Sequence, residues 1–339
     1  MSTVFNIEDD KKTPKYMQIV RSVTDAIREG KLKKGDPILS INELSDEFIL
    51  SRDTVQKAYM HLRKQGYLVS VRGKGFFINR TDVATPFRIL LLFNKISNYK
   101  KQIYNAFVHA MGEQAVIDLK IHHSNVRLFE SFVINHQFEY DYYVIMPHFY
   151  DQPEIVEAII KKIPAEKLII LDKDLTNNYS KYAGVYQDFK NDIYQALESG
   201  LDLIRKYNRL VLVYPKMVPY PPEIKIGFRF FCSHHQVDYT IIPELEEGMD
   251  AEKGTAYIVI EETDLVNLIK NCRSQKLVIG KDIGIISYNE TPLKEILLDG
   301  ITVISTDHVK MGENAARMIL DKKREKVKNP FMLIRRNSL

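Results

Sequence analysis

Cysteine and long apolar runs are scarce in this chain of 339 residues. Its two cysteines, Cys232 and Cys272, form no CxxC pair, which argues against a disulfide framework or structural zinc site and favours a reducing environment. No apolar stretch approaches the roughly 18 residues that a membrane span needs. The N-terminal stretch MSTVFNIEDDKK also lacks the apolar core of a secretion signal. We therefore expect a cytoplasmic protein without a membrane partner.

Signatures of common enzymes are also missing. The chain contains no GxSxG, HExxH, GxGxxG or phosphate-binding GxxxxGKS/T segment. Its adjacent histidine pairs, His122-His123 and His234-His235, cannot present one metal-binding face because neighbouring side chains point in different directions. We expect no enzyme activity, no cofactor and no bound metal.

Basic charge is concentrated near the N-terminus. Residues 1–80 hold 15 Lys and Arg against 10 Asp and Glu, whereas the remainder holds 33 against 34. Neutralisation of phosphates supplies most non-specific affinity for nucleic acid, so this quarter is where DNA contacts are expected. The length predicts about two domains, and 45% hydrophobic with 27% charged residues is typical of globular protein.

Residues 40–78 carry the pattern of two short helices followed by a hairpin. The second helix has an apolar stripe at helical spacing, formed by Val55, Ala58, Tyr59 and Leu62. Ser51 is a suitable N-cap before this stripe, and Gly66 is a suitable stop after it. Two strand-length segments follow, residues 67–71 and 75–78, with a basic tip at 72–74 between them. Together with a first helix over 14–29, the pattern predicts a winged helix-turn-helix.

Residues 14–78 resemble the DNA-binding domain of the GntR family of bacterial transcription regulators. The resemblance lies in the segments Tyr16–Ile19, Gly30–Asp36, Ser51–Val55, Gly66–Leu68 and Gly73–Gly75. It implies operator DNA as a partner and the following candidate contacts: Lys15, Tyr16, Ser40, Asn42, Arg52, Asp53, Thr54, Gln56, Lys57, Arg72, Lys74 and Gly75. A second helix with polar side chains in its first turns suits the major groove, whose base edges offer donors and acceptors.

Four positions depart from the family pattern. Asn42 stands where a DNA-contacting arginine is common, Asp53 where a small hydroxyl residue is frequent, and Gln56 where arginine or lysine is usual. Ile49 occupies the place of the turn glycine, where a β-branched residue is strained if φ is positive. We therefore expect an operator sequence that differs from those of better-known members.

From residue 88 onward, apolar runs of strand length alternate with helical segments. The predicted strands are 89–93, 142–146, 168–171, 210–214, 257–260 and 283–287. The predicted helices are 100–114, 125–137, 153–163, 189–206, 223–235 and 263–272. Unbroken apolar strands between helices predict a doubly wound α/β fold with a parallel sheet covered on both faces. The length makes two such lobes our expectation, so the predicted domains are 1–78, a linker at 79–87, and 88–339.

The C-terminal segments resemble the end of a LacI-type sugar-responsive domain, which has the type I periplasmic-binding-protein fold. The resemblance lies in Ile283–Leu293, Ile301–Ile304, Met311–Ala316 and Leu333–Ser338. With a GntR head, this architecture is similar to the arabinose-repressor subfamily. It implies two lobes joined by three crossovers, with an effector in the cleft between them. We also expect a homodimer, because half-sites on DNA are commonly paired.

Polar residues that follow the predicted strands are the candidate effector contacts, since open α/β sheets bind ligands beyond the carboxyl ends of their strands. They are Tyr99, Lys101, His148, Asp172, Asp188, Lys225, Arg229, Glu262, Thr263 and Asn289. By resemblance, Asp188 and Asn289 match sugar-binding positions, whereas the family's sugar-binding arginine is replaced by Ile224. Each candidate also has a structural interpretation; Asp188, for example, is a good helix N-cap.

The sequence thus predicts a sugar-responsive transcription regulator, with repression of a carbohydrate catabolic operon relieved by a monosaccharide (a pentose or deoxyhexose) or a sugar phosphate. The alternative from another class is a cytosolic sugar-binding or sugar-modifying protein whose winged helix mediates protein contacts. Sequence-specific binding of DNA separates the two, because only a regulator requires it.

Overall fold

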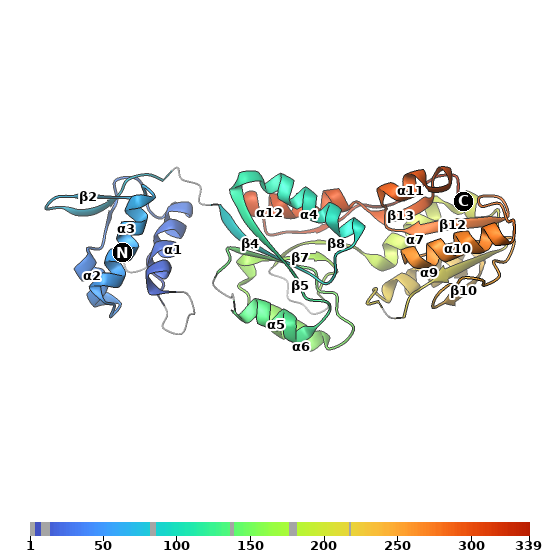
Figure 1. Ribbon diagram of the computed structural model, residues 1–339, viewed down its shortest axis with the longest axis horizontal. Coiled ribbons are helices and arrows are strands. Elements are labelled where there is room, and N and C mark those ends of the chain that lie inside the picture. The colour runs from blue at the N-terminus through green and yellow to red at the C-terminus, as the bar shows by residue number, and fades with distance from the viewer. Residues whose placement is uncertain (1–3, 8–13, 82–85, 136–138, 176–181, 217) are drawn as a thin grey trace. The chain divides into compact units, whose positions relative to one another are not determined.

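A computed structural model describes residues 4–7, 14–81, 86–135, 139–175, 182–216 and 218–339 (Figure 1). The chain separates into two compact units, one built on the N-terminal winged helix and one holding most of the α/β body, and each is described by itself. No helix in the described ranges is long and apolar enough to cross a membrane.

The N-terminal part is the predicted winged helix-turn-helix. It consists of α1 (Lys15–Arg28), β1 (Pro37–Ile38), α2 (Ile41–Glu47), α3 (Arg52–Lys64), β2 (Leu68–Val71) and β3 (Gly75–Ile78). The three strands form an antiparallel sheet in the order β1-β3-β2. The predicted stripe on α3 is buried against Ile19 and Val23 of α1, which forms a small hydrophobic core.

The first lobe of the body is a six-stranded sheet with helices on both faces. Its order β14-β8-β7-β6-β4-β5 uses β4 (Phe87–Phe93), β5 (Ala115–Ile121), β6 (Tyr142–Ile145), β7 (Leu168–Asp172), β8 (Ala183–Tyr186) and β14 (Lys326–Lys328). The pairs from β14 to β4 are all parallel. One face is covered by α4 (Asn98–Met111) and α12 (His308–Leu320), and the other by α5 (Val126–Asn135) and α6 (Pro153–Ile160), as Figure 1 shows.

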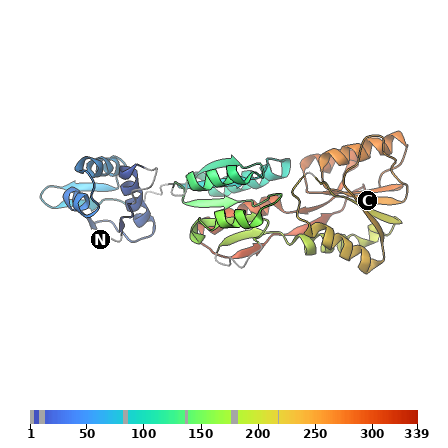
Figure 2. The same cartoon turned by 90° about the horizontal axis from the view of Figure 1, so that it is seen from below.

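The second lobe is another six-stranded sheet, in the order β10-β9-β11-β12-β13-β15. Its strands are β9 (Arg209–Val213), β10 (Asp238–Ile242), β11 (Thr255–Val259), β12 (Ile283–Tyr288), β13 (Thr302–Thr306) and β15 (Phe331–Ile334). All pairs are parallel except β13 with β15. Its helices are α7 (Phe189–Ser199), α8 (Leu201–Ile204), α9 (Glu223–His235), α10 (Glu262–Ser274) and α11 (Pro292–Ile296). Figure 2 shows α9 and α10 on opposite faces of this sheet.

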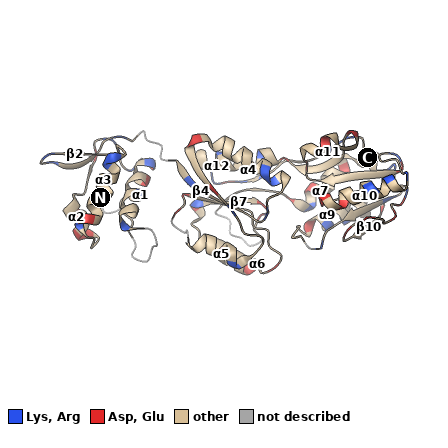
Figure 3. Ribbon diagram, viewed as in Figure 1, with Lys and Arg blue, Asp and Glu red and all other residues tan. Residues whose placement is uncertain are grey.

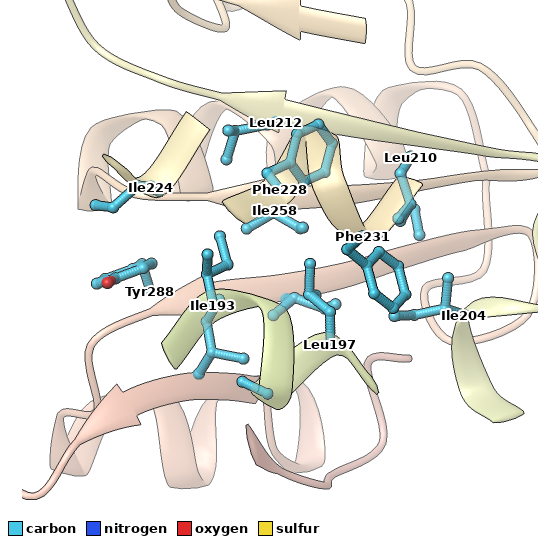
Figure 4. Packing of buried hydrophobic residues seen from close by; sticks show 14 of the residues in the cluster. Ile193, Leu197, Ile204, Leu210, Leu212, Ile224, Phe228, Phe231, Ile258 and Tyr288 are labelled. Atoms are coloured by element: carbon cyan, nitrogen blue, oxygen red, sulfur yellow. The ribbon is translucent and has the colours of Figure 1, made fainter. Parts of the chain in front are cut away.

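The core of the second lobe lies where α7 and α9 pack on the sheet. Figure 4 shows Phe228 and Phe231 of α9 against Ile193 and Leu197 of α7. Ile224 is fully buried in this cluster. The position of the family's sugar-binding arginine therefore belongs to the core in this chain.

Three crossovers join the lobes within the described ranges. They are residues 186–189, 306–308 and 328–331, and each leads from a strand of one lobe into an element of the other. Asn329, which is fully buried, ties all three together. Its side-chain amide donates to Thr306 Oγ1 and Asp307 O, both at 2.8 Å, and its backbone N–H donates to Tyr186 O at 2.8 Å.

Some predicted elements need correction. The predicted helix 189–206 is two helices that meet at Gly200, where a β-carbon would lie 2.7 Å from Leu333 Cδ1. Strands β1, β5, β8, β10, β13, β14 and β15 were not predicted as strands, and helices α11 and α12 were not predicted as helices. The predicted helix 125–137 is α5, and residues 136 and 137 lie outside the described ranges, as does part of the predicted linker, 82–85.

Candidate functional site

The N-terminal end of α3 presents polar side chains to solvent. Ser51 caps the helix by accepting the backbone N–H of Thr54 at 3.2 Å, and its hydroxyl lies 2.8 Å from the Thr54 hydroxyl. Arg52, Asp53, Gln56 and Lys57 are exposed, because the buried stripe occupies the opposite side of the helix. This is the arrangement that major-groove reading requires, with a fixed helix and mobile donors and acceptors at its start.

Three of the candidate contacts, Tyr16, Ser40 and Lys57, are engaged within the domain. The Lys57 ammonium lies over the Tyr16 ring, 4.2 Å from its centroid, which restrains Lys57 on the helix surface. Ser40 forms a capping box with Glu43 at the start of α2, where it accepts the Glu43 N–H at 3.2 Å. Lys15, close to Tyr16, lies at the start of α1 and is half-buried.

Asn42 and the hairpin tip remain exposed. Asn42 lies in the first turn of α2, and Arg72 and Lys74 flank the tip where Gly73 and Gly75 have positive φ. Figure 3 marks Lys and Arg positions on the ribbon of α1 and α3 in blue. Ile49, between α2 and α3, has φ of 50° and is 95% exposed, as its replacement of a turn glycine predicts.

The second candidate site is a cavity in the cleft between the two lobes of the body, with a volume of about 30 Å³. Four of the predicted effector residues line it: Tyr99, His148, Asp172 and Asn289. The sheets explain their meeting. Asp172 ends β7 and His148 follows β6 in the first lobe, while Asn289 follows β12 in the second, so that the carboxyl ends of both parallel sheets supply the polar groups.

A buried carboxylate forms the centre of this cavity, referred to below as the cleft cavity. Asp172 accepts a hydrogen bond from His148 Nε2 at 2.8 Å and another from the Gln187 amide. Burial alone would raise the pKa of Asp172, but these hydrogen bonds and the charge of Lys100 hold it well below its ordinary value. Burial lowers the pKa of His148. The group at the centre is therefore an ionised acceptor that the His148 and Gln187 side chains hold in place.

Lys100 brings the balancing charge into the cleft. It is 2% exposed and donates to Asn94 Oδ1. Burial lowers the pKa of Lys100 to about 8, although the nearby Asp172 charge opposes the shift. Lys101, the lysine predicted from the sequence to contact the effector, is exposed on α4. Successive side chains on a helix point in directions that differ by roughly 100°, so that Lys100 faces into the cleft when Lys101 faces solvent.

Two buried polar atoms of the cavity lining have no hydrogen-bond partner within the described part of the chain. They are Oε1 of Gln187, which follows β8, and the hydroxyl of Tyr288, which ends β12. Gln187 is 7% exposed and Tyr288 is 2% exposed. Unsatisfied groups at this depth are rare in proteins and cost free energy. Neither residue was singled out from the sequence, because no local pattern reveals such burial.

A buried lysine fixes the loop that holds Asn289. Lys294 is 3% exposed and donates to the carbonyl oxygens of Tyr288 at 2.9 Å and Asn289 at 2.7 Å. Asn289 and Asp172 both have positive φ, 64° and 73°, a backbone conformation that Asn and Asp tolerate better than most residues. Strained conformations of this kind are concentrated at functional sites.

The remaining predicted effector residues lie outside the cleft cavity. Asp188 caps α7 by accepting the Asn191 N–H at 3.3 Å, and Arg229 is exposed on α9. Glu262 and Thr263 are exposed in the first turn of α10. Their neighbour Glu261 is the acidic residue that reaches the first lobe, with an oxygen 3.4 Å from Lys95 Nζ. Lys225 lines an adjacent groove. Within the described ranges, no group of three His, Cys, Asp or Glu side chains could hold a metal ion.

Both parts of the chain match known families of protein domains. Residues 15–78 match the family of bacterial regulatory proteins called the gntR family. The chain carries a GntR-family DNA-binding domain. Residues 203–339 match a periplasmic binding protein-like domain.

Curated relatives match mainly through the GntR domain. One is the HTH-type transcriptional repressor YtrA of Bacillus subtilis, 29% identical over 107 residues, which are 32% of this chain and 78% of that one. Another is the arabinose metabolism transcriptional repressor of Geobacillus stearothermophilus, 35% identical over 71 residues, which are 21% of this chain and 20% of that one. The matched part therefore spans most of the first relative but only a fifth of the second.

Solved structures support the fold of the body. A dimeric Lac repressor aligns with a TM-score of 0.61 at 14% identity, covering 74% of this chain and 98% of that one. A LacI family regulator from Enterococcus faecium with bound ribose aligns with a TM-score of 0.59 at 19% identity, with the same coverage. The body that accompanies the GntR domain thus has the two-lobed LacI and periplasmic-binding-protein fold.

Proposed function

We propose that this protein is a transcription repressor whose affinity for DNA is controlled by a sugar. The observation that carries the proposal is the pair of buried polar atoms in the cleft cavity, Gln187 Oε1 and the Tyr288 hydroxyl. One comes from each lobe, and both lack partners within the described ranges. Ligand hydroxyls that bridge them would satisfy both lobes at once, which links ligand binding to lobe closure.

The chemistry of the lining supports a polyhydroxylated ligand. A sugar hydroxyl donates and accepts hydrogen bonds, and the lining offers an ionised acceptor in Asp172, a cationic donor in Lys100 and an amide in Asn289. The resemblance of the sequence to the arabinose-repressor subfamily favours a monosaccharide unit, a pentose or deoxyhexose, or its phosphate.

Lobe closure is the step that would couple the sugar to DNA. The Lys95–Glu261 ion pair at 3.4 Å and a hydrogen bond of 3.4 Å from Gln102 to the Glu290 carbonyl already join the lobes across the cleft. A sugar that binds one degree of closure more tightly shifts the population towards it, and the shift changes the spacing of two GntR domains in a homodimer on a paired half-site operator. Repression that is relieved by sugar follows when closure disfavours the DNA-bound arrangement.

Two measurements on the purified full chain test the proposal. A DNA sequence enriched from a random pool is used in anisotropy titrations, and a carbohydrate panel is used in thermal-shift assays. Arg52→Ala should reduce specific DNA affinity by about fivefold or more, since a side chain that reads a base contributes about 1–3 kcal/mol. It should leave the sugar-induced thermal shift unchanged.

Arg63→Ala is the matched control, because Arg63 is also an exposed arginine but lies at the C-terminal end of α3. It should weaken specific and non-specific DNA binding alike, and only slightly. Failure to enrich any DNA sequence would refute the proposal that the protein is a transcription repressor. If a DNA sequence is enriched but no carbohydrate changes the affinity of the protein for it, control by a sugar is refuted.

A further inference from the structure

A larger groove, with a volume of about 510 Å³, lies beside the cleft cavity. The two spaces are neighbours, because Val218, Pro219 and Tyr220 line both of them. The groove is lined from both lobes, for example by Tyr150 of the first and Tyr214 of the second. We call it the aromatic groove, because four aromatic rings and four further prolines besides Pro219 line it.

The volumes of the cleft cavity and the aromatic groove determine which part of a ligand each can hold. A single water needs about 10–15 Å³ of cavity volume in this measure, so that 30 Å³ admits only a hydroxyl-bearing end of a ligand. The aromatic groove lies within the range of about 300–1,000 Å³ that ligand sites occupy. A ligand that reaches Gln187 and Tyr288 therefore has most of its volume in the groove.

Two rings of the groove, those of Tyr214 and Phe149, are held in place by contacts within the protein. The Tyr214 hydroxyl donates to the Tyr220 carbonyl at 2.6 Å, and the Lys225 ammonium lies 4.5 Å from the centre of the Tyr214 ring. Phe149 stacks on His122 with ring centroids 4.5 Å apart and an interplanar angle of 16°. Fixed rings bind at a low entropic cost. Tyr150 also lines the groove and is 60% exposed.

Flat ring faces beside a polar cavity suit a chain of sugar rings. The C–H face of a pyranose is apolar and gains free energy by packing on an aromatic ring, whereas its hydroxyls remain at the edge. Lysines 173, 216 and 225 line the same groove, but Lys216 is exposed and Lys225 is engaged with Tyr214. Ring stacking therefore accounts for the groove better than the binding of an anionic group does.

From this geometry we propose that the effector contains at least two sugar rings, with one ring directed into the cleft cavity and the next stacked in the aromatic groove. The inference rests on the proposed function, and it replaces a lone monosaccharide by a disaccharide or larger glycoside. Its terminal unit is the pentose or deoxyhexose proposed above.

The test is calorimetric titration of the full chain with matched carbohydrates. The probes are L-arabinose, D-xylose, L-fucose and D-glucose, disaccharides that contain each of them, and glucose 6-phosphate. We expect one disaccharide to bind at least tenfold more tightly than its constituent monosaccharides. Tyr150→Ala should reduce that preference to less than threefold with little change in monosaccharide affinity.

Phe230→Ala is the matched control, because Phe230 is 57% exposed on α9 and does not line the groove. It should retain the full preference for the disaccharide. Equal affinities for monosaccharide and disaccharide, tighter binding of the phosphate, or a preference that survives Tyr150→Ala would each overturn this inference and leave the proposed function standing. Absence of binding by every carbohydrate would overturn the proposed function as well.

Discussion

Removing the hydroxyl of Tyr288 should stabilise the ligand-free protein and weaken its binding of sugar. The hydroxyl lies at the end of β12 in a residue that is 2% exposed, and it has no partner within the described ranges. Its ring packs near Phe331, with centroids 5.7 Å apart, and Figure 4 shows it at the edge of the hydrophobic cluster. Tyr288→Phe keeps this ring and deletes only the oxygen.

The two effects have opposite signs and can be bounded. A buried polar group without a partner costs about 1–3 kcal/mol, so that its removal should raise the free energy of unfolding by about 1 kcal/mol or more. In a domain of this size, 1 kcal/mol raises the melting temperature by about 2–4 °C. A hydrogen bond to the ligand contributes about 0.5–1.5 kcal/mol, so that the dissociation constant should rise about twofold to twelvefold.

Tyr207→Phe is a close control. Tyr207 belongs to the same hydrophobic cluster, and its hydroxyl is also buried without a partner in the described ranges, but it does not line the cleft cavity. Differential scanning calorimetry and titration with the best carbohydrate of the panel give both quantities. The Tyr207 variant should be stabilised without loss of affinity. A Tyr288→Phe variant that is less stable without ligand and has unchanged affinity for sugar would contradict the role proposed for this hydroxyl.

Three further predictions concern single sites. Ile49→Gly should stabilise the GntR domain against urea by about 0.5–1 kcal/mol. The reason is that positive φ costs an L-residue about 1–2 kcal/mol, and glycine loses part of that gain through chain entropy. The control Ile96→Gly, at an exposed site without positive φ, should not stabilise the protein. Asn329→Ala should lower the free energy of unfolding of the body by about 2 kcal/mol through loss of its two crossover hydrogen bonds, and a loss below 0.5 kcal/mol would contradict this role. Burial lowers the pKa of His122 to about 4, so that its contribution to stability is complete above the unfolded pKa of about 6.5 and is lost as the pH falls towards 4. His122→Gln should therefore reduce the loss of stability between pH 7 and pH 4.5 by about 2 kcal/mol, as measured by urea titration at each pH.

The fold was predictable where a local pattern determines the structure. The α3 stripe, its Ser51 cap and most of the strongly apolar strands were found from spacing and residue type, whereas the apolar β15 was not. Two other strands that escaped prediction have weaker signals: β5 alternates along a sheet edge with mostly half-buried residues, and β8 is short and contains Gly184. Their pairing in the sheet, and not their own sequence, makes them strands.

The cleft was only partly predictable, for a different physical reason. Strand ends predicted Asp172, His148 and Asn289, because parallel topology brings such positions together. Lys100 and Gln187 escaped, since a lysine and a glutamine are exposed in most proteins and only tertiary packing decides that these are buried. For the same reason, the sequence predicted Lys101 and Glu262 as effector contacts, whereas the side chains that enter the cleft are those of their neighbours Lys100 and Glu261. A sequence indicates the loop, but the rotation of a helix settles which side chain enters the cleft.

The threading of the chain through the two lobes has a consequence for its synthesis on the ribosome. The first lobe begins with β4, but its sheet and its helical cover are complete only after α12 and β14, at residue 328. The GntR domain, by contrast, has all of its elements by residue 78. Because domains generally fold as units in order of emergence, the GntR domain can form while both lobes are still unfinished. A nascent chain that stalls midway would therefore carry a folded winged helix-turn-helix beside an incomplete α/β body.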